Sequence, residues 1–187
     1  MRRRLLAAAL AAAAFAPALA ADEYALDGMH TAVTFRVSHL GLSWVYGRFN
    51  DVTGNFTIDP GDPARCSFAL DVKTESIDTG NQKRDGHLAS PDFFNVKQYP
   101  LLTFKSTAVR AIEGGYEVTG DLTLRGVTRP VTFPLKGGRT AEFPKGVQRT
   151  GYSTELTIKR SEFGMDKMPD AVGDPVHIAV SFEGVKK

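Results

Sequence analysis

Apolar side chains occupy every second position through most of the chain, with polar side chains between them. Residues 33–37, 68–72 and 176–182 all show this alternation. Successive side chains of a β-strand point to opposite faces of the sheet, so each such segment is predicted to form a strand with one apolar and one polar face. The chain is therefore predicted to be all-β, with its apolar faces turned toward a common interior.

Nine segments have the length and alternation of strands. They are residues 31–38, 44–53, 55–59, 66–74, 101–110, 116–124, 131–136, 151–160 and 175–183. Turns rich in Gly and Pro separate many of them, including residues 59–63 and 113–115. Short connections imply antiparallel pairing of about eight strands. The alternation is compatible with a closed barrel and with a packed β-sandwich.

The alternation stops between residues 77 and 99, where a short helix is predicted over residues 81–89. Asp78 or Thr79 is the expected cap, and Pro91 follows the helix end. We interpret this segment as a helical crossover that covers one end of the sheet. Phe93 and Phe94 come directly after it and are expected to turn toward the apolar interior.

Residues 1–20 have the three parts of a secretory leader: an Arg-rich start, an apolar stretch and a cleavage site ending at Ala20. We expect cleavage after Ala20 and a single mature domain, residues 21–187. A transmembrane anchor is the alternative, but the apolar stretch is short and ends at Pro17. Removal of the leader leaves 20 Lys and Arg against 21 Asp and Glu. This balance makes nucleic acid an unexpected partner.

The chain lacks the motifs of metal sites and of common catalytic centres. Its four His residues, at positions 30, 39, 87 and 177, show no H-x-H or H-x-x-x-H spacing. There is no G-x-S-x-G elbow and no phosphate-binding Gly loop. Cys66 is the single Cys, and its alternation with Phe68 predicts a buried, unreactive thiol. We therefore expect no metal, no cofactor and no enzymatic activity.

Several short motifs follow one another in a characteristic order along the chain. They are Asp27-x-x-His30-Thr31-x-Val33-x-Phe35, Arg84-Asp85-x-His87-Leu88, Asp92-Phe93-Phe94, Tyr99-Pro100, Gly120-x-Leu122-Thr123-Leu124-x-Gly126 and Arg160-x-Glu162-Phe163-Gly164. Their order and spacing resemble those of the YceI-like family of periplasmic lipid- and polyisoprenoid-binding proteins. The resemblance implies an extended, lipocalin-like antiparallel β-barrel in the periplasm. Its interior would sequester or carry a long isoprenoid chain, such as that of a quinone or a prenyl diphosphate.

The inward faces of the predicted strands and the two crossover Phe residues supply candidates for the cavity lining. These are Val33, Phe35, Val37, Phe56, Phe68, Leu70, Phe93, Phe94, Phe104, Leu122, Leu124, Phe133, Leu156 and Ile158. Aromatic side chains at this spacing also fill solid cores. A ligand-free β-sandwich that mediates protein contacts is therefore an alternative interpretation.

Polar candidates for binding a lipid head group lie at strand ends and on the predicted helix. Continuing the inward positions leads to His39 in one strand and Arg160 in another, while the helix carries Arg84, Asp85 and His87. In the alternative interpretation, Arg160 pairs with an acid and the helical cluster fixes the helix to the barrel. An enzyme acting on a lipid head group through the helical residues is the alternative function. Transient membrane contact and homodimer formation are compatible with either function.

Overall fold

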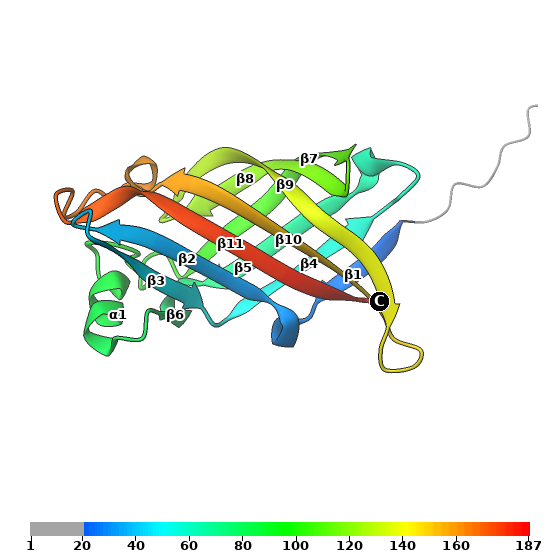
Figure 1. Ribbon diagram of the computed structural model, residues 1–187, viewed down its shortest axis with the longest axis horizontal. Coiled ribbons are helices and arrows are strands. Elements are labelled where there is room, and N and C mark those ends of the chain that lie inside the picture. The colour runs from blue at the N-terminus through cyan, green and yellow to red at the C-terminus, as the bar shows by residue number, and fades with distance from the viewer. Residues whose placement is uncertain (1–20) are drawn as a thin grey trace, which may run out of the picture.

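The computed structural model describes residues 21–187, so the predicted leader at residues 1–20 lies outside the described residues. Eleven strands and one short α-helix follow one another along this part of the chain (Figure 1). They are β1 (Asp22–Leu26), β2 (Ala32–His39), β3 (Ser43–Phe49), β4 (Val52–Ile58), β5 (Ser67–Lys73), β6 (Ile77–Asp78), α1 (Gln82–Ala89), β7 (Leu101–Ile112), β8 (Gly115–Leu124), β9 (Val127–Glu142), β10 (Gln148–Lys159) and β11 (Val172–Lys186). Four 3-10 turns connect some of them: η1 (Gly28–His30), η2 (Pro63–Arg65), η3 (Thr74–Ser76) and η4 (Arg160–Phe163).

Eight strands close into an antiparallel barrel in the order β1, β4, β5, β7, β8, β9, β10, β11, with β11 pairing back to β1. Closure depends on the length of β11. Its last residues pair with β1, whereas residues 176–181 pair with β2, so that β2, β3 and β6 extend the wall at one end. The predicted all-β antiparallel barrel is confirmed, and the alternative of two packed sheets is wrong.

The predicted helix is present, and it lies at one end of the barrel, on the left in Figure 1. Its cap is Asn81, whose side chain accepts a hydrogen bond from the Arg84 backbone N–H at 3.0 Å. The expectation that Asp78 or Thr79 caps the helix is therefore wrong. Within residues 21–187, no helix has the length and apolar character needed to cross a membrane.

The strand boundaries differ from the prediction where Gly was interpreted as a turn. Gly54 lies inside β4 and not between strands. A glycine is needed at this position because any side chain would collide with the backbone of Ala69 on the paired strand β5. The turn between β3 and β4 is formed by Asn50 and Asp51 instead. β9 is also longer than predicted.

A cluster of aromatic rings fills the end of the barrel where β1 pairs with β11. The Tyr24 and Phe56 rings stack with centroids 5.0 Å apart, and Phe56 also contacts Phe68, Tyr152 and Phe182. Aromatic pairs at these distances add stability beyond the area that they bury. We call the residues Tyr24, Phe56, Phe68, Tyr116, Tyr152 and Phe182 the aromatic plug. It makes this end of the barrel solid.

Cys66 packs against the aromatic plug, and its side chain is buried as predicted. Its Sγ accepts a hydrogen bond from the backbone N–H of Asp59 at 3.2 Å. Burial raises the pKa of the Cys66 thiol, so the reactive thiolate is disfavoured at neutral pH.

Candidate functional site

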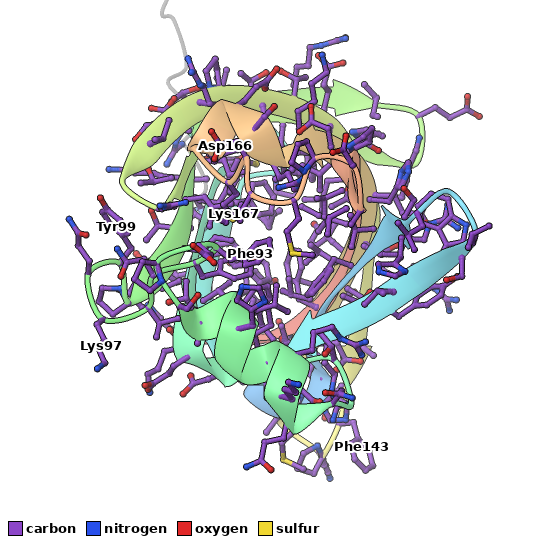
Figure 2. All side chains as sticks on the ribbon, turned by 90° about the vertical axis from the view of Figure 1, so that its left-hand side faces the viewer. Phe93, Lys97, Tyr99, Phe143, Asp166 and Lys167 are labelled. Carbon is purple, nitrogen blue, oxygen red and sulfur yellow. The ribbon has the colours of Figure 1, made fainter. Side chains whose placement is uncertain are left out.

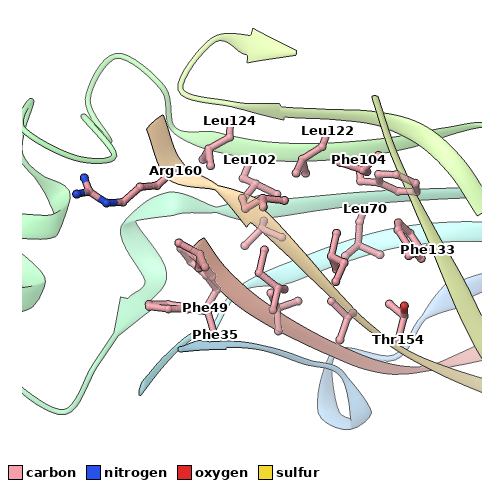
Figure 3. Close-up of a pocket in the computed structure, with 18 of the residues that line it drawn as sticks. Phe35, Phe49, Leu70, Leu102, Phe104, Leu122, Leu124, Phe133, Thr154 and Arg160 are labelled. Carbon is pink, nitrogen blue, oxygen red and sulfur yellow. The ribbon is translucent and has the colours of Figure 1, made fainter. Parts of the chain in front are cut away.

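The other part of the barrel interior is hollow. It contains a cavity of about 170 Å³ whose lining comprises 27 residues, of which all but Thr154 and Arg160 are apolar (Figure 3). The lining residues are Val33, Phe35, Val37, Phe49, Phe68, Leu70, Val72, Leu88, Phe93, Phe94, Leu102, Phe104, Leu122, Leu124, Val131, Phe133, Leu135, Thr154, Leu156, Ile158, Arg160, Met165, Val172, Val176, Ile178, Val180 and Phe182.

Alternation along the strands produces this apolar wall. On β10, the side chains of Thr154, Leu156 and Ile158 all face the cavity, and Arg160 follows at the strand end. At about 3.3 Å per residue, the stretch from residue 154 to residue 160 measures about 20 Å. The cavity is therefore elongated along the strands, a shape that suits a chain better than a compact molecule.

The two ends of the cavity differ. Phe68 and Phe182 belong both to the aromatic plug and to the cavity lining, so the plug forms one end of the cavity. At the other end, Leu88, Phe93 and Phe94 come from the helical crossover. Figure 2 looks into this end, with Phe93 near the centre and α1 lying across part of the opening. The aromatic plug thus closes one end of the cavity, and the helical crossover covers the other end.

Of the predicted lining residues, Phe56 does not line the cavity, so this prediction is wrong. Its side chain is 2% exposed and lies in the aromatic plug, where it contacts other aromatic rings and not the cavity. The other thirteen predicted residues line the cavity. Phe56 and Phe68 are paired across β4 and β5, so both face inward. Alternation predicts the face of the sheet, whereas the position along the barrel axis separates plug from cavity.

Arg160 lines the cavity with its aliphatic part, and its guanidinium group points away from the other lining side chains (Figure 3). The guanidinium group donates to four backbone carbonyl oxygens: Nε to Gly173 at 3.0 Å, Nη2 to Val172 at 2.8 Å, and Nη1 to Met165 and Lys167. Four of its five N–H groups are thereby used. The alternative that Arg160 pairs with an acid is wrong, because no ion pair among residues 21–187 includes it.

Thr154 is the other polar group in the cavity lining, and its hydrogen bond is satisfied. Its hydroxyl donates to the carbonyl oxygen of Pro134 at 2.6 Å. With Thr154 and Arg160 both bonded to backbone carbonyls, the cavity surface presents almost only hydrocarbon. Such a surface favours an apolar ligand.

The predicted helical cluster lies outside the cavity. Nε of Arg84 donates to the hydroxyl of Thr79 at 2.7 Å, Asp85 accepts from the same residue, and His87 Nε2 lies 3.1 Å from Asp92 Oδ2. These contacts stay within the crossover, so they hold α1 against its own flanking segments and do not fix it to a strand of the barrel. His39, at the end of β2, is exposed and is also absent from the cavity lining. The structure therefore does not bring the predicted head-group residues together.

Within residues 21–187, one group of side chains has the spacing of metal ligands: Asp27, His30 and Glu183. Arg149 lies among them, with Nη1 bonded to Asp27 Oδ2 and 3.5 Å from Glu183 Oε2. The hydrogen bonds from Arg149 and His30 hold the pKa of Asp27 well below its usual value. The guanidinium group occupies the position that a cation would take, so this group is interpreted as an ion-pair network.

Comparison with known proteins agrees with this geometry. Residues 24–184 match the model of the YceI-like domain. The chain belongs to the YceI-like family. It is 40% identical, over the full length of both chains, to a UPF0312 protein of Pseudomonas aeruginosa and to Protein YceI of Escherichia coli. The predicted family is thereby confirmed.

Solved structures show the same fold as this YceI-like chain. BcnA of Burkholderia cenocepacia is 26% identical, with a TM-score of 0.77 over 84% of this chain and 98% of that chain. A polyisoprenoid binding domain from Saccharophagus degradans has a TM-score of 0.65 over 88% of this chain and 98% of that chain. At 17% identity, the second likeness concerns the fold alone.

Thirteen lining residues of this YceI-like barrel were absent from the sequence-based set. Val176, Ile178 and Val180 belong to an alternating segment and could have been found by the same rule that found Phe35. Met165 and Val172 lie on either side of the loop before β11, outside any predicted strand. No periodic signal marks these two residues, so only the fold reveals them.

Proposed function

We propose that this protein binds a long isoprenoid chain in its barrel and sequesters or carries it through an aqueous compartment. The observation that carries the proposal is the lining of the cavity, which is elongated and apolar apart from two residues with satisfied hydrogen bonds. The YceI-like family and the fold shared with a polyisoprenoid binding domain from Saccharophagus degradans support the same ligand class.

Burial of the chain supplies the affinity. Transfer of an alkyl chain from water to such a surface contributes roughly 0.8 kcal/mol per CH₂ group, so about ten buried carbons contribute about 8 kcal/mol before the loss of mobility is subtracted. Affinity then rises with chain length. A quinone and a prenyl diphosphate share this apolar part, and both are candidates.

The polar end of the ligand is expected to lie outside the cavity. Arg160 has one N–H group beyond those that bind carbonyl oxygens, and the helical residues bond to one another. A role in selecting the head group therefore falls to the rim and not to the interior. No contact in the crossover favours the alternative of an enzyme that acts on the head group.

The proposed location is the periplasm, after export and cleavage behind Ala20. The leader-like residues 1–20 and the family resemblance support this location. N-terminal sequencing of the protein purified from cells tests the cleavage site, with Ala21 as the expected first residue. A chain that starts at Met1 would contradict it.

Native mass spectrometry tests ligand binding directly. Protein purified without detergent is expected to carry an additional mass that organic solvent removes and that matches an isoprenoid lipid. Protein with no such mass, and with no uptake of added ubiquinone or farnesyl diphosphate, would refute the proposal.

A lipid carrier must also meet the membrane, and the hairpin of β2 and β3 is suited to this contact. Its tip carries Leu40 and the 83% exposed Leu42, with Trp44 next along the same outer face. The tip lies beside the loop before β11, since the Leu40 N–H donates to the Ala171 carbonyl oxygen at 2.8 Å. In Figure 1 both lie at the same end as α1. Trp is typical of the membrane interface.

The charge of this hairpin suits an anionic phospholipid surface. The sequence from residue 28 to residue 50 contains two Arg residues and no Asp or Glu; Arg48 pairs with Asp78 of β6, and Arg36 has no ion pair among residues 21–187. Arg36 lies over the Trp44 ring, with Cζ 4.7 Å from the ring centroid. The apolar tip would enter the bilayer while Arg36 and Trp44 remain at the level of the phosphates.

Trp44 is the single Trp of the chain, so its fluorescence reports on this contact. Phosphatidylglycerol vesicles are expected to shift its emission to the blue. The variant Leu42→Asp should lose the shift, whereas Phe143→Asp, at another exposed site on the turn between β9 and β10, should keep it. An unchanged emission with the wild-type protein would refute membrane contact, and a shift that depends on protein concentration alone would indicate a dimer.

A further inference from the structure

The barrel wall is incompletely paired between β9 and β10. Their ladder runs from the pair Gln148 and Glu142 to the pair Ser153 and Lys136, and no residue beyond this last pair is in register. β9 nevertheless continues to Val127 and β10 to Lys159. About six residues of each strand therefore lie next to each other without backbone pairing.

The sequence of β9 explains where the ladder stops. Gly137 directs its N–H toward the carbonyl oxygen of Gly114, at the turn between β7 and β8. Because backbone groups alternate in direction along a strand, odd-numbered residues of this part of β9 face β8 and even-numbered residues face β10. Pro130 and Pro134 therefore stand at positions whose N–H would point toward β10, and proline has none.

Two residues beyond the last pair, the same register would place Pro134 opposite Glu155. The donor that this pair needs is missing, and the carbonyl oxygen of Pro134 accepts the Thr154 hydroxyl instead. Pro130 repeats the defect four residues further along. The two prolines thus keep β9 and β10 apart over the hollow part of the barrel.

A groove lies on the wall where the pairing is absent. It is lined by residues 129–134 of β9, residues 155–159 of β10 and the nearby Glu162 and Phe163. Val131, Phe133, Leu156 and Ile158 line this groove and the central cavity alike. Only a single layer of apolar side chains therefore separates the cavity from the solvent at this place.

We propose that this groove is a lateral opening of the cavity, through which an alkyl chain enters and leaves. The inference rests on the proposed function, because it assumes an apolar chain as the ligand. In this proposal the four shared side chains turn aside to connect groove and cavity, whereas the end near α1 is covered by the crossover and by a loop that Arg160 fixes. No backbone hydrogen bond between β9 and β10 has to break.

Addition of a partner strand is the competing use of an unpaired edge. The same two prolines disfavour it, because β9 offers no donor at either position. Arg129 and Lys159 also line the groove and are exposed, and charged side chains on an edge discourage strand pairing.

The test restores the missing donors. In the double variant Pro130→Thr and Pro134→Thr, β9 can pair with β10 and close the groove. The protein is loaded with dansyl-labelled undecanoic acid, and release is followed by the loss of dansyl emission after excess unlabelled fatty acid is added. Exchange is expected to slow about tenfold, which corresponds to about 1.4 kcal/mol in the barrier. An unchanged exchange rate would overturn the proposal.

A matched control separates closure of the groove from general stiffening. Pro175 lies on β11, opposite Lys159 and outside the groove, so Pro175→Thr makes the same chemical change in a neighbouring strand. This variant is expected to exchange the probe at the wild-type rate. Equal slowing in this variant and in the double variant would count against a lateral opening.

A second variant keeps the proposal testable if the double variant does not fold. Thr132, between the two prolines, is exposed and lines the groove. Thr132→Cys labelled with a bulky maleimide should slow exchange, whereas the same label on Thr107→Cys of β7 should not. Cys66 is buried and stays unlabelled. If the wild-type protein binds neither the probe nor added ubiquinone or farnesyl diphosphate, the proposed function fails, whereas binding of the probe with equal exchange in every variant refutes the lateral opening alone.

Discussion

The guanidinium group of Arg160 donates to the carbonyl oxygen of Gly173 at 3.0 Å, from the end of β10 to the start of β11. Together with the bonds to Met165, Lys167 and Val172, this contact fixes the loop between the two strands. A buried cation that is held by carbonyl oxygens alone is a structural element, and its removal leaves several acceptors without donors.

Replacement of Arg160 by Lys is therefore expected to reduce the free energy of unfolding by at least about 2 kcal/mol, because an ammonium group cannot reach four carbonyl oxygens. Urea unfolding measures the loss. Lys105→Met, at an exposed site without an ion pair, should change stability by less than about 0.5 kcal/mol. Full stability of Arg160→Lys would contradict the structural role.

Filling the cavity should separate ligand binding from folding. Ile178 lines the cavity and is half-buried, so Ile178→Trp places a larger side chain in empty space. We expect dansyl-labelled undecanoic acid to bind at least about tenfold more weakly, with a loss of stability below about 1.5 kcal/mol. Fluorescence titration and urea unfolding give the two values. Equal losses in both would show that the interior acts as an ordinary core.

The aromatic plug should respond in the opposite way. Phe56 is fully buried among other rings, and Phe56→Ala is expected to cost about 3–5 kcal/mol of stability. Binding of the probe by the remaining folded protein should be nearly unchanged, because Phe56 does not line the cavity. Phe133→Ala is the matched variant, with a smaller loss of stability and weaker binding. A stability loss for Phe133→Ala as large as that for Phe56→Ala would contradict the division into plug and cavity.

The sequence predicts the barrel wall well because one rule, the alternation of side chains, governs it. The rule places Phe35, Leu70 and Ile158 on the inner face, and all three line the cavity. The rule does not give height along the barrel axis, which is why Phe56 was assigned to the cavity. Nor does it describe strand ends, such as the end of β2, where His39 is exposed to the solvent.

The polar residues were harder to predict, because their partners are backbone groups. Arg160 lies on the inner face as expected, but its donors bind carbonyl oxygens of a loop that has no sequence pattern. Pro130 and Pro134 are visible in the sequence, and their effect on pairing depends on which neighbour each backbone group faces. That direction follows from the register of β8, β9 and β10, which only the fold supplies.

The network around Asp27 should make stability depend on pH in the acid range. Hydrogen bonds from Arg149 and His30 lower the pKa of Asp27 in the folded protein below its unfolded value of about 3.9. A carboxyl group with a lowered pKa stabilises the fold fully above that unfolded value, and the contribution is lost as the pH falls toward the folded pKa. The difference in urea midpoint between wild type and Asp27→Asn should therefore be constant near neutral pH and shrink below about pH 4. Glu113→Gln, in an exposed turn, should show no such difference. A difference that persists undiminished at acid pH would show that the ion pairs of Asp27 do not contribute to stability.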